Sequence, residues 1–205
     1  MSQQPEEIDR PTQRERQRAE TRERLFQAAL TEFRRAGVAG ARIERIASAV
    51  GVVRGTFYFH FPTKDHVLQE LQLRSQERIM DHLQKLDPER DGVDELLQAI
   101  VDGLEDGAEV VNDGALLRDT LALYVRHPIE PGMGDDEPRP LLEMAATVLA
   151  AAQKRGEMRA DLSPEGAVAV IFSGIFGLFA TPSAPGRGGL LRDWVELVAR
   201  GLAPS

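Results

Sequence analysis

Residues 42–65, RIERIASAVGVVRGTFYFHFPTKD, contain the pattern that decides the fold. Its first part has an apolar side chain at Ile43 and others three, four and seven residues after it, at Ile46, Ala47 and Val50. This spacing predicts a short helix with one buried face over residues 43–50. Gly51 follows directly, and glycine is the residue type that ends a helix in the left-handed conformation. A tight turn of about three to four residues is expected after it.

The second part of the stretch, residues 54–61, predicts another helix of different character. Phe57 and Phe61 lie four residues apart, so both can be buried on one side. The hydrogen-bonding side chains are then expected to face outward: Arg54, Thr56, Tyr58 and His60. Gly55 lets a partner approach the backbone closely. Pro62 ends this helix, and Thr63 is expected to cap the next one.

Two short helices joined by a glycine-containing turn form a helix-turn-helix, whose second helix enters the major groove of DNA in many proteins. The exposed donors would then reach base edges, while Tyr58 and Lys64 would reach phosphates. A corner in a helical bundle without DNA-binding function is the alternative.

The extended stretch IERIASAVGVVRGTFYFHFPTKDHVL resembles the DNA-binding signature of the TetR family of bacterial transcriptional regulators. The matching features are Ile46-Ala47, Gly51-Val52, Gly55-Thr56, the aromatic run that ends in His60-Phe61, and Thr63-Lys64-Asp65. Upstream, residues 21–37 look like the first helix of that family. The resemblance implies a ligand-responsive regulator that binds a palindromic operator as a dimer. Most members of this family are repressors, so a repressor is expected.

By resemblance, the positions that touch DNA in this family are Arg54, Gly55, Thr56, Tyr58, His60 and Lys64. Two positions depart from the pattern, because many relatives have a capping Ser or Thr where this chain has Arg42 and Val53. Losing such a cap typically costs about 1 kcal/mol. We expect Arg42 to compensate in part for the missing helix cap by binding a phosphate of the DNA. Val53 stands at a DNA-facing position, although its side chain cannot form a hydrogen bond.

The charge distribution fits an N-terminal DNA-binding domain, although the net charge of the 205 residues is −8. Residues 1–65 contain 12 basic and 9 acidic residues, and the remainder contains 13 basic and 24 acidic ones. The basic excess therefore lies with the motif. Because this excess is modest, specific binding would depend on a dimer that doubles the contacts.

No motif for catalysis, metal binding or a cofactor is found, so we expect neither an enzyme nor a cofactor. The four histidines, at positions 60, 66, 82 and 127, form no zinc-binding pair. The chain has no cysteine, which excludes disulfides and thiolate metal sites and is compatible with a reducing cytoplasm. The first twenty residues lack the apolar run of a signal peptide, so a cytoplasmic location is expected.

The domain organisation expected from the sequence is all-α. Residues 1–19 are polar and are expected to form a disordered arm, which is either a solvated tail or a contact to an adjacent DNA groove. Residues 20–66 form the helix-turn-helix domain, with the motif at about 43–62 and a first helix over about 21–36. Residues 67–205 form a larger helical effector-binding and dimerisation domain. The helix over about 64–86 crosses the boundary between them.

Five further helices are expected, at about 91–111, 114–126, 140–155, 164–180 and 188–202. Residues 127–140 contain four prolines and are expected to form a loop, either a lid or a simple connection. The stretch GAVAVIFSGIFGLFA within 164–180 is the most apolar of the chain, but it is too short to span a membrane. It must be buried on nearly all sides.

A homodimer is expected to form through the last two helices. Ala169, Ser173 and Gly177 form a stripe of small residues that would allow close approach of another helix, and Trp194 and Val198 lie on the last helix. Packing within one chain is the alternative. For a small-molecule effector, whose identity the sequence does not give, we expect a pocket with polar and aromatic residues: Arg118, Tyr124, His127, Phe172 and Phe176. The alternative for most of them is an ordinary surface or core position.

Overall fold

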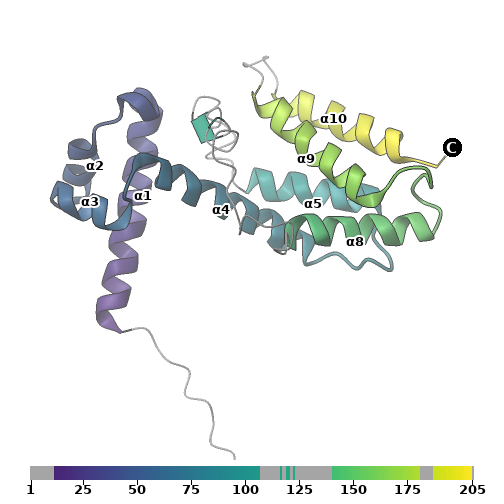
Figure 1. Cartoon of the computed structure of the whole chain (residues 1–205), viewed down its shortest axis with the longest axis horizontal. Helices are drawn as coiled ribbons and strands as arrows, with labels where there is room; N and C mark the ends of the chain where they lie inside the picture. Colours follow the sequence, from purple (N-terminus) through teal and green to yellow (C-terminus); the bar gives the residue numbers. More distant parts are fainter. Residues whose placement is uncertain are drawn as a thin grey trace, which may run out of the picture. The chain divides into compact units, whose positions relative to one another are not determined.

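The computed structural model describes residues 12–106, 116, 119–120, 122, 140–180 and 187–204 (Figure 1). Every regular element in these residues is a helix, and no strand occurs among them. The all-α class expected from the sequence is therefore confirmed. Contacts between Cα atoms divide the chain into two compact units, Met1–Val67 and Leu68–Ser205. None of the described helices is both long enough and apolar enough to cross a bilayer.

The first unit contains α1 (Gln13–Gly40), α2 (Ile43–Val50) and α3 (Arg54–His60), as Figure 1 shows. Its core consists of buried apolar side chains. They include Leu25, Phe26, Ala29, Leu30 and Phe33 from α1, Ile43, Ile46, Ala47 and Val50 from α2, and Phe57 and Phe61. The burial predicted from the sequence for the four apolar positions of α2 and for the two phenylalanines is therefore confirmed.

The start of α1 differs from the prediction, because the helix begins at Gln13 and not near residue 21. Residues 13–19 are therefore helical, and the prediction of a disordered arm is wrong for them. Thr12 and Glu15 form a capping box: the Glu15 N–H donates to Thr12 Oγ1 at 3.3 Å, and the Thr12 N–H donates to Glu15 Oε2 at 2.6 Å. The Arg, Gln and Glu residues that follow are good helix formers. Residues 1–11 lie outside the described residues.

Two glycines shape the first unit by adopting the positive φ that other residues avoid. Gly37, with φ of 68°, introduces a kink near the end of α1, where the helix was expected to stop. Gly51, with φ of 78°, ends α2, and its N–H donates to the carbonyls of Ala47 and Ser48. The left-handed glycine expected after α2 is confirmed, and it sets the direction of the turn into α3.

The second unit consists of α4 (Lys64–Leu83) from Leu68 onward, α5 (Val93–Glu105), α8 (Pro140–Lys154), α9 (Pro164–Ala180) and α10 (Arg187–Leu202). Within it, α8 packs against α5 and α9, and α10 packs against α5 and α9 (Figure 1).

The helices α4 and α5 end about three and six residues earlier than expected. Ser163 caps α9, because its Oγ accepts from the Gly166 N–H at 3.0 Å. The helix expected at 114–126 is described only at residues 116, 119–120 and 122, which are helical, and the loop at 127–139 lies outside the described residues.

Candidate nucleic-acid interface

The recognition helix α3 is anchored from behind by two aromatic rings. Phe57 and Phe61 are both fully buried, with ring centroids 5.8 Å apart, and Phe61 also lies 6.5 Å from the ring of Phe26 in α1. Burying a phenylalanine contributes about 1.5–3 kcal/mol relative to leaving it exposed. A helix of only seven residues is not stable alone. These rings therefore hold α3 in place on the three-helix core.

The opposite side of α3 is exposed and combines donors with apolar surface. Arg54 and Gly55 are exposed at its start, Tyr58 is 39% exposed, and Thr56 is half-buried. Val53, which precedes the helix, has 75% of its surface exposed. A methyl-rich side chain at such a position suits contact with a thymine methyl group. The outward orientation expected for Arg54 and Tyr58 is confirmed.

Arg54 connects α2 and α3 through its guanidinium group. Its Nη1 lies 2.8 Å from Glu44 Oε1, and its Nη2 donates to Tyr58 Oη at 3.1 Å. The guanidinium also lies 5.4 Å from the centroid of the Tyr58 ring. The hydrogen bond to Tyr58 and the nearby Glu44 carboxylate raise the pKa of Arg54 above its ordinary value. Both side chains of the ion pair are more than half exposed, so the pair orients Arg54 more than it stabilises the fold.

His60 contradicts the prediction that it faces outward, because only 8% of its surface is exposed. It occupies the last position of α3, next to α1, where the helix turns its side chains back toward the core. Burial, and then the charges of Arg18 and Arg22, lower the pKa of His60 below its ordinary value. A neutral, buried imidazole is a packing residue in the DNA-free protein.

Two arginines of α1 support the motif in a way that sequence reasoning missed. Arg22 Nη1 donates to the His60 carbonyl at 2.7 Å, and its guanidinium lies 4.4 Å from the centroid of the Phe61 ring. Arg24 Nη2 donates to the Val50 carbonyl at 2.8 Å. Each arginine therefore places positive charge and a donor at the C-terminal end of a helix, where the carbonyls lack partners within the helix.

Glu32 provides the support that the uncapped start of α2 lacks. Arg42 is exposed and makes no side-chain cap, but the Arg42 N–H donates to Glu32 Oε1 at 3.3 Å. Arg35 donates twice to the same carboxylate, at 2.7 Å each, and Arg45 Nε lies 3.4 Å from it. These contacts, that of Arg35 above all, lower the pKa of Glu32 to about 2. A charged carboxylate is therefore held at the N-terminal end of α2, where it is most favourable.

Lys64, expected at a phosphate, is half-buried at the start of α4. Its Nζ donates to the carbonyls of Val38 and Ala39 at 2.8 and 3.0 Å. These contacts hold the ammonium group at the C-terminal end of α1. Eight residues were predicted to contact DNA. Five of them lie side by side in the motif: Val53 directly precedes α3, and Arg54, Gly55, Thr56 and Tyr58 belong to it. Arg42 is exposed beside α2, and His60 and Lys64 contact the protein itself.

The residues predicted for the effector and the dimer interface lie in the second unit, and the structure describes them only in part. Arg118, Tyr124 and His127 lie outside the described residues, and of Phe176 only the helical backbone is described. Phe172 is half-buried in α9.

Ala169, Ser173 and Gly177 share an exposed side of α9, while Trp194 and Val198 are half-buried in α10. In the described ranges, no group of three or more His, Asp or Glu side chains is arranged to hold a metal ion.

The helices α9 and α10 expose large apolar side chains in the single chain. Val170 of α9 and Leu197 of α10 are 67% and 71% exposed, respectively. The opposite side of α9 is buried at Ala167, Val168, Ile171 and Ile175. The expectation that this helix is buried on nearly all sides is therefore wrong within one chain, because the described side chains of α9 leave one side of the helix exposed.

Comparison with known proteins agrees with this geometry. The family model described as bacterial regulatory proteins, tetR family, matches residues 25–71. The probable acrEF/envCD operon repressor of Escherichia coli K12 is 32% identical over 101 residues, which are 48% of this chain and 46% of that protein. The chain thus matches less than half the length of this relative.

Two other relatives match over most of their length. The probable HTH-type transcriptional regulator ArpR of Pseudomonas putida is 30% identical over 187 residues, covering 87% of this chain and 85% of that protein. The solved structure of Thermus thermophilus FadR, a TetR-family repressor in complex with lauroyl-CoA, is 25% identical with a TM-score of 0.55, covering 87% of this chain and 91% of that one. The fold, the motif and the length of these matches agree, and the chain belongs to the TetR family of bacterial regulatory proteins.

Proposed function

We propose that the chain is a ligand-responsive transcriptional repressor that binds a near-palindromic operator as a homodimer and is released by a small molecule. The observation that carries this proposal is the geometry of α3. Phe57 and Phe61 fix the helix from behind, while Arg54 and Tyr58 stand on its exposed side. A short, rigidly held helix with exposed donors suits base-edge readout in the major groove.

The dimer is supported by apolar surface that one chain leaves uncovered. Val170 and Leu197 are largely exposed on α9 and α10, and Ala169, Ser173 and Gly177 are small residues on the exposed side of α9. A two-fold arrangement of these helices from two chains would form a four-helix interface. It would also present two recognition helices to successive major grooves, about 34 Å apart.

The effector site is proposed for the second unit. Gln72 of α4 is only 8% exposed, and among the described residues neither its amide nitrogen nor its amide oxygen has a hydrogen-bond partner. An unpaired buried amide costs about 1–3 kcal/mol, which a ligand with both a donor and an acceptor would offset. The lauroyl-CoA in the Thermus thermophilus relative supports a small-molecule effector in general. Because α4 runs without a break from Lys64 into the second unit, a ligand-induced shift of α4 would reach the motif.

We infer that the chain acts by binding and not by catalysis, in the cytoplasm where its DNA lies. The relatives found are transcription regulators, which favours this reading over an enzyme. Fluorescence anisotropy with a labelled duplex from upstream of the gene, measured across a salt series, tests the DNA-binding part. A regulator binds this duplex more tightly than a scrambled duplex, and affinity falls with rising salt. Equal affinity for both duplexes contradicts the proposal.

Reciprocal coupling tests the ligand-responsive part. Any molecule that lowers operator affinity must itself bind the operator complex more weakly than the free dimer, by the same factor. Equal affinity of such a molecule for free and DNA-bound protein would rule out the release mechanism.

A further inference from the structure

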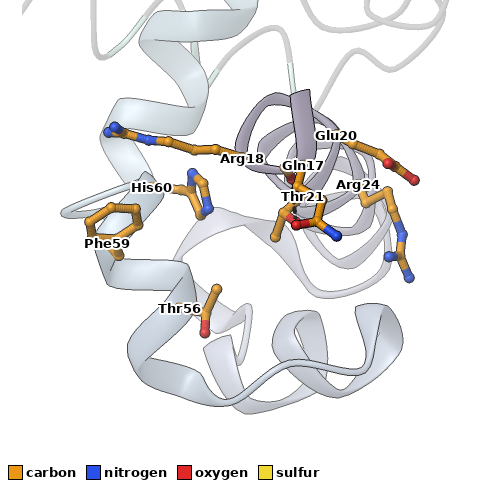
Figure 2. Close-up of a pocket in the computed structure, with 8 residues that line it drawn as sticks. All are labelled: Gln17, Arg18, Glu20, Thr21, Arg24, Thr56, Phe59 and His60. Carbon is orange, nitrogen blue, oxygen red and sulfur yellow. Dashed lines mark hydrogen bonds between the residues drawn. The ribbon is translucent and has the colours of Figure 1, made fainter. Parts of the chain in front are cut away.

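The first turns of α1 form one wall of an open groove of about 520 Å³ in the first unit (Figure 2). The other wall is the C-terminal half of α3. The lining residues are Gln17, Arg18, Glu20, Thr21 and Arg24 from α1, and Thr56, Phe59 and His60 from α3. We call this the α1–α3 groove. It exists because α1 begins at Gln13, about three turns before Leu25, the first residue of α1 that is buried in the core.

The side of the groove next to α3 carries a positive charge above an exposed ring. The Arg18 guanidinium lies 4.9 Å from the centroid of the Phe59 ring, and 64% of Phe59 is exposed. Figure 2 shows Arg18 reaching from α1 toward Phe59, whereas Glu20 and Arg24 extend to the other side of α1. Among the described residues no carboxylate pairs with Arg18, so its N–H donors remain available.

The groove is continuous with the surface proposed to bind DNA. Thr56 and Phe59 belong both to its lining and to α3, so a duplex seated on α3 passes its opening. Arg14 lies one turn before Arg18 on α1 and is also exposed, which extends the positive side of the groove toward the N-terminal end of the helix. A flat guanidinium stacked on a ring presents its donors in one plane, which matches two oxygens of a phosphate.

We propose that the α1–α3 groove binds the DNA backbone beside the half-site that α3 reads, with Arg18 as the phosphate ligand and Phe59 as the ring that orients it. This inference rests on the proposed function and adds a contact outside the helix-turn-helix. It makes the first two turns of α1 a part of the DNA-binding surface. The footprint on DNA is then longer than the two helix-turn-helix motifs alone would cover.

The test compares Arg18→Ala with Arg16→Ala on two duplexes. Arg16 has the same charge and lies on the same exposed turn, but it does not line the groove. One duplex carries the operator with ten or more flanking base pairs, roughly one helical turn, on each side, and the other ends at the half-sites. Anisotropy across a salt series gives affinity and salt dependence, and circular dichroism melting checks that each variant folds.

On the long duplex, Arg18→Ala is expected to weaken binding about 3- to 10-fold and to reduce the salt slope by about 0.9 for each phosphate that is no longer neutralised. On the trimmed duplex its effect should be smaller, and Arg16→Ala should have little effect on either. Arg18→Lys should keep most of the salt slope but bind more weakly than wild type, because it retains the charge without the planar donors.

The inference is overturned if Arg18→Ala binds the long duplex as wild type does, or if Arg16→Ala is equally impaired. It is also overturned if affinity falls by the same factor on both duplexes, because Arg18 would then act within the half-site. Failure of the proposed function looks different: wild-type protein would show no preference for the operator over a scrambled duplex of either length.

Discussion

At the first residue of α3, one guanidinium contacts side chains from two helices. Arg54 is held by Glu44 of α2 on one side and by Tyr58 of α3 on the other. An arginine that is already oriented loses less conformational entropy when it binds a base edge. The neighbouring Gly55 has no atom within 4 Å of where a Cβ would stand. The space beside the backbone is therefore open to a partner.

Gly55→Ala separates folding from DNA binding at this position. Because a Cβ meets nothing within 4 Å, the variant should fold as well as wild type, and the better helix propensity of alanine should add up to about 1 kcal/mol of stability. Operator affinity should fall if DNA approaches the backbone here. Thermal melting and anisotropy check the two effects, and a variant with unchanged affinity would show that no DNA atom comes close to Gly55.

Glu32→Gln tests the carboxylate that supports the start of α2. The pKa of Glu32 is lowered from 4.5 to about 2, mainly by the Arg35 hydrogen bonds. A lowered pKa contributes stability that is complete above about 4.5 and is lost as the pH falls toward about 2. We expect the variant to melt at a lower temperature at pH 7. The difference from wild type should shrink between these two pH values. A difference that is independent of pH would contradict the role of the charge.

At the scale of helices, the motif was the most predictable part of the chain. Local spacing predicts α2, the left-handed Gly51 and the buried Phe57 and Phe61, because all of these depend on neighbours within about four residues. The same local spacing misplaced His60, since burial at the end of a short helix depends on what packs against it. The spacing of apolar residues does not predict the start of α1 either, because its first turns are polar. The only local signal there is the capping box of Thr12 and Glu15.

Contacts over long sequence distances could not be predicted from these patterns. The Arg22 and Arg24 bonds to helix carbonyls span 38 and 26 residues, respectively. Nothing in the spacing of the arginines shows which carbonyl each one reaches. The same holds for Lys64, whose ammonium group contacts α1 carbonyls that lie 25 and 26 residues earlier in the sequence.

The crossing of α4 and α5 in the second unit depends on a glycine. A Cβ added at Gly103 would lie 2.6 Å from Ile79 Cα, a backbone atom that cannot move aside cheaply. Gly103→Ala should therefore separate the two helices and cost about 1–3 kcal/mol. Urea denaturation measures the decrease in stability, with Gly201→Ala, where nothing lies within 4 Å of the added Cβ, as the matched control. Equal stability of the two variants would show that the crossing can adjust.

For the whole molecule, the separation of charge and the uncovered apolar surface point to different partners. Residues 1–65 have an excess of three basic residues, whereas the rest of the chain has an excess of eleven acidic ones. The acidic part is repelled by DNA, and its exposed apolar residues on α9 and α10 suit a second copy of the chain. Because the basic excess is small, doubling it through a dimer matters for affinity.

Leu197→Glu tests this dimer. A charge at a position that is 71% exposed in the single chain should leave folding of the chain intact, but it should oppose burial between two copies. Analytical ultracentrifugation should show a monomer, and operator affinity should fall at least tenfold because only one half-site is then bound. Leu73→Glu on α4, at 44% exposure, is the control and should remain a dimer. A dimeric Leu197→Glu variant would place the interface elsewhere.

The most direct test of the central claim is the affinity of Arg54→Ala for the upstream duplex, measured by anisotropy beside a thermal melt. If the exposed side of α3 reads DNA, affinity falls about 10- to 100-fold, as expected when one base-edge interaction is removed, while the melting temperature stays close to that of wild type. Arg90→Ala, an exposed arginine of the second unit, should bind as wild type does. Wild-type affinity in the Arg54→Ala variant would contradict the account.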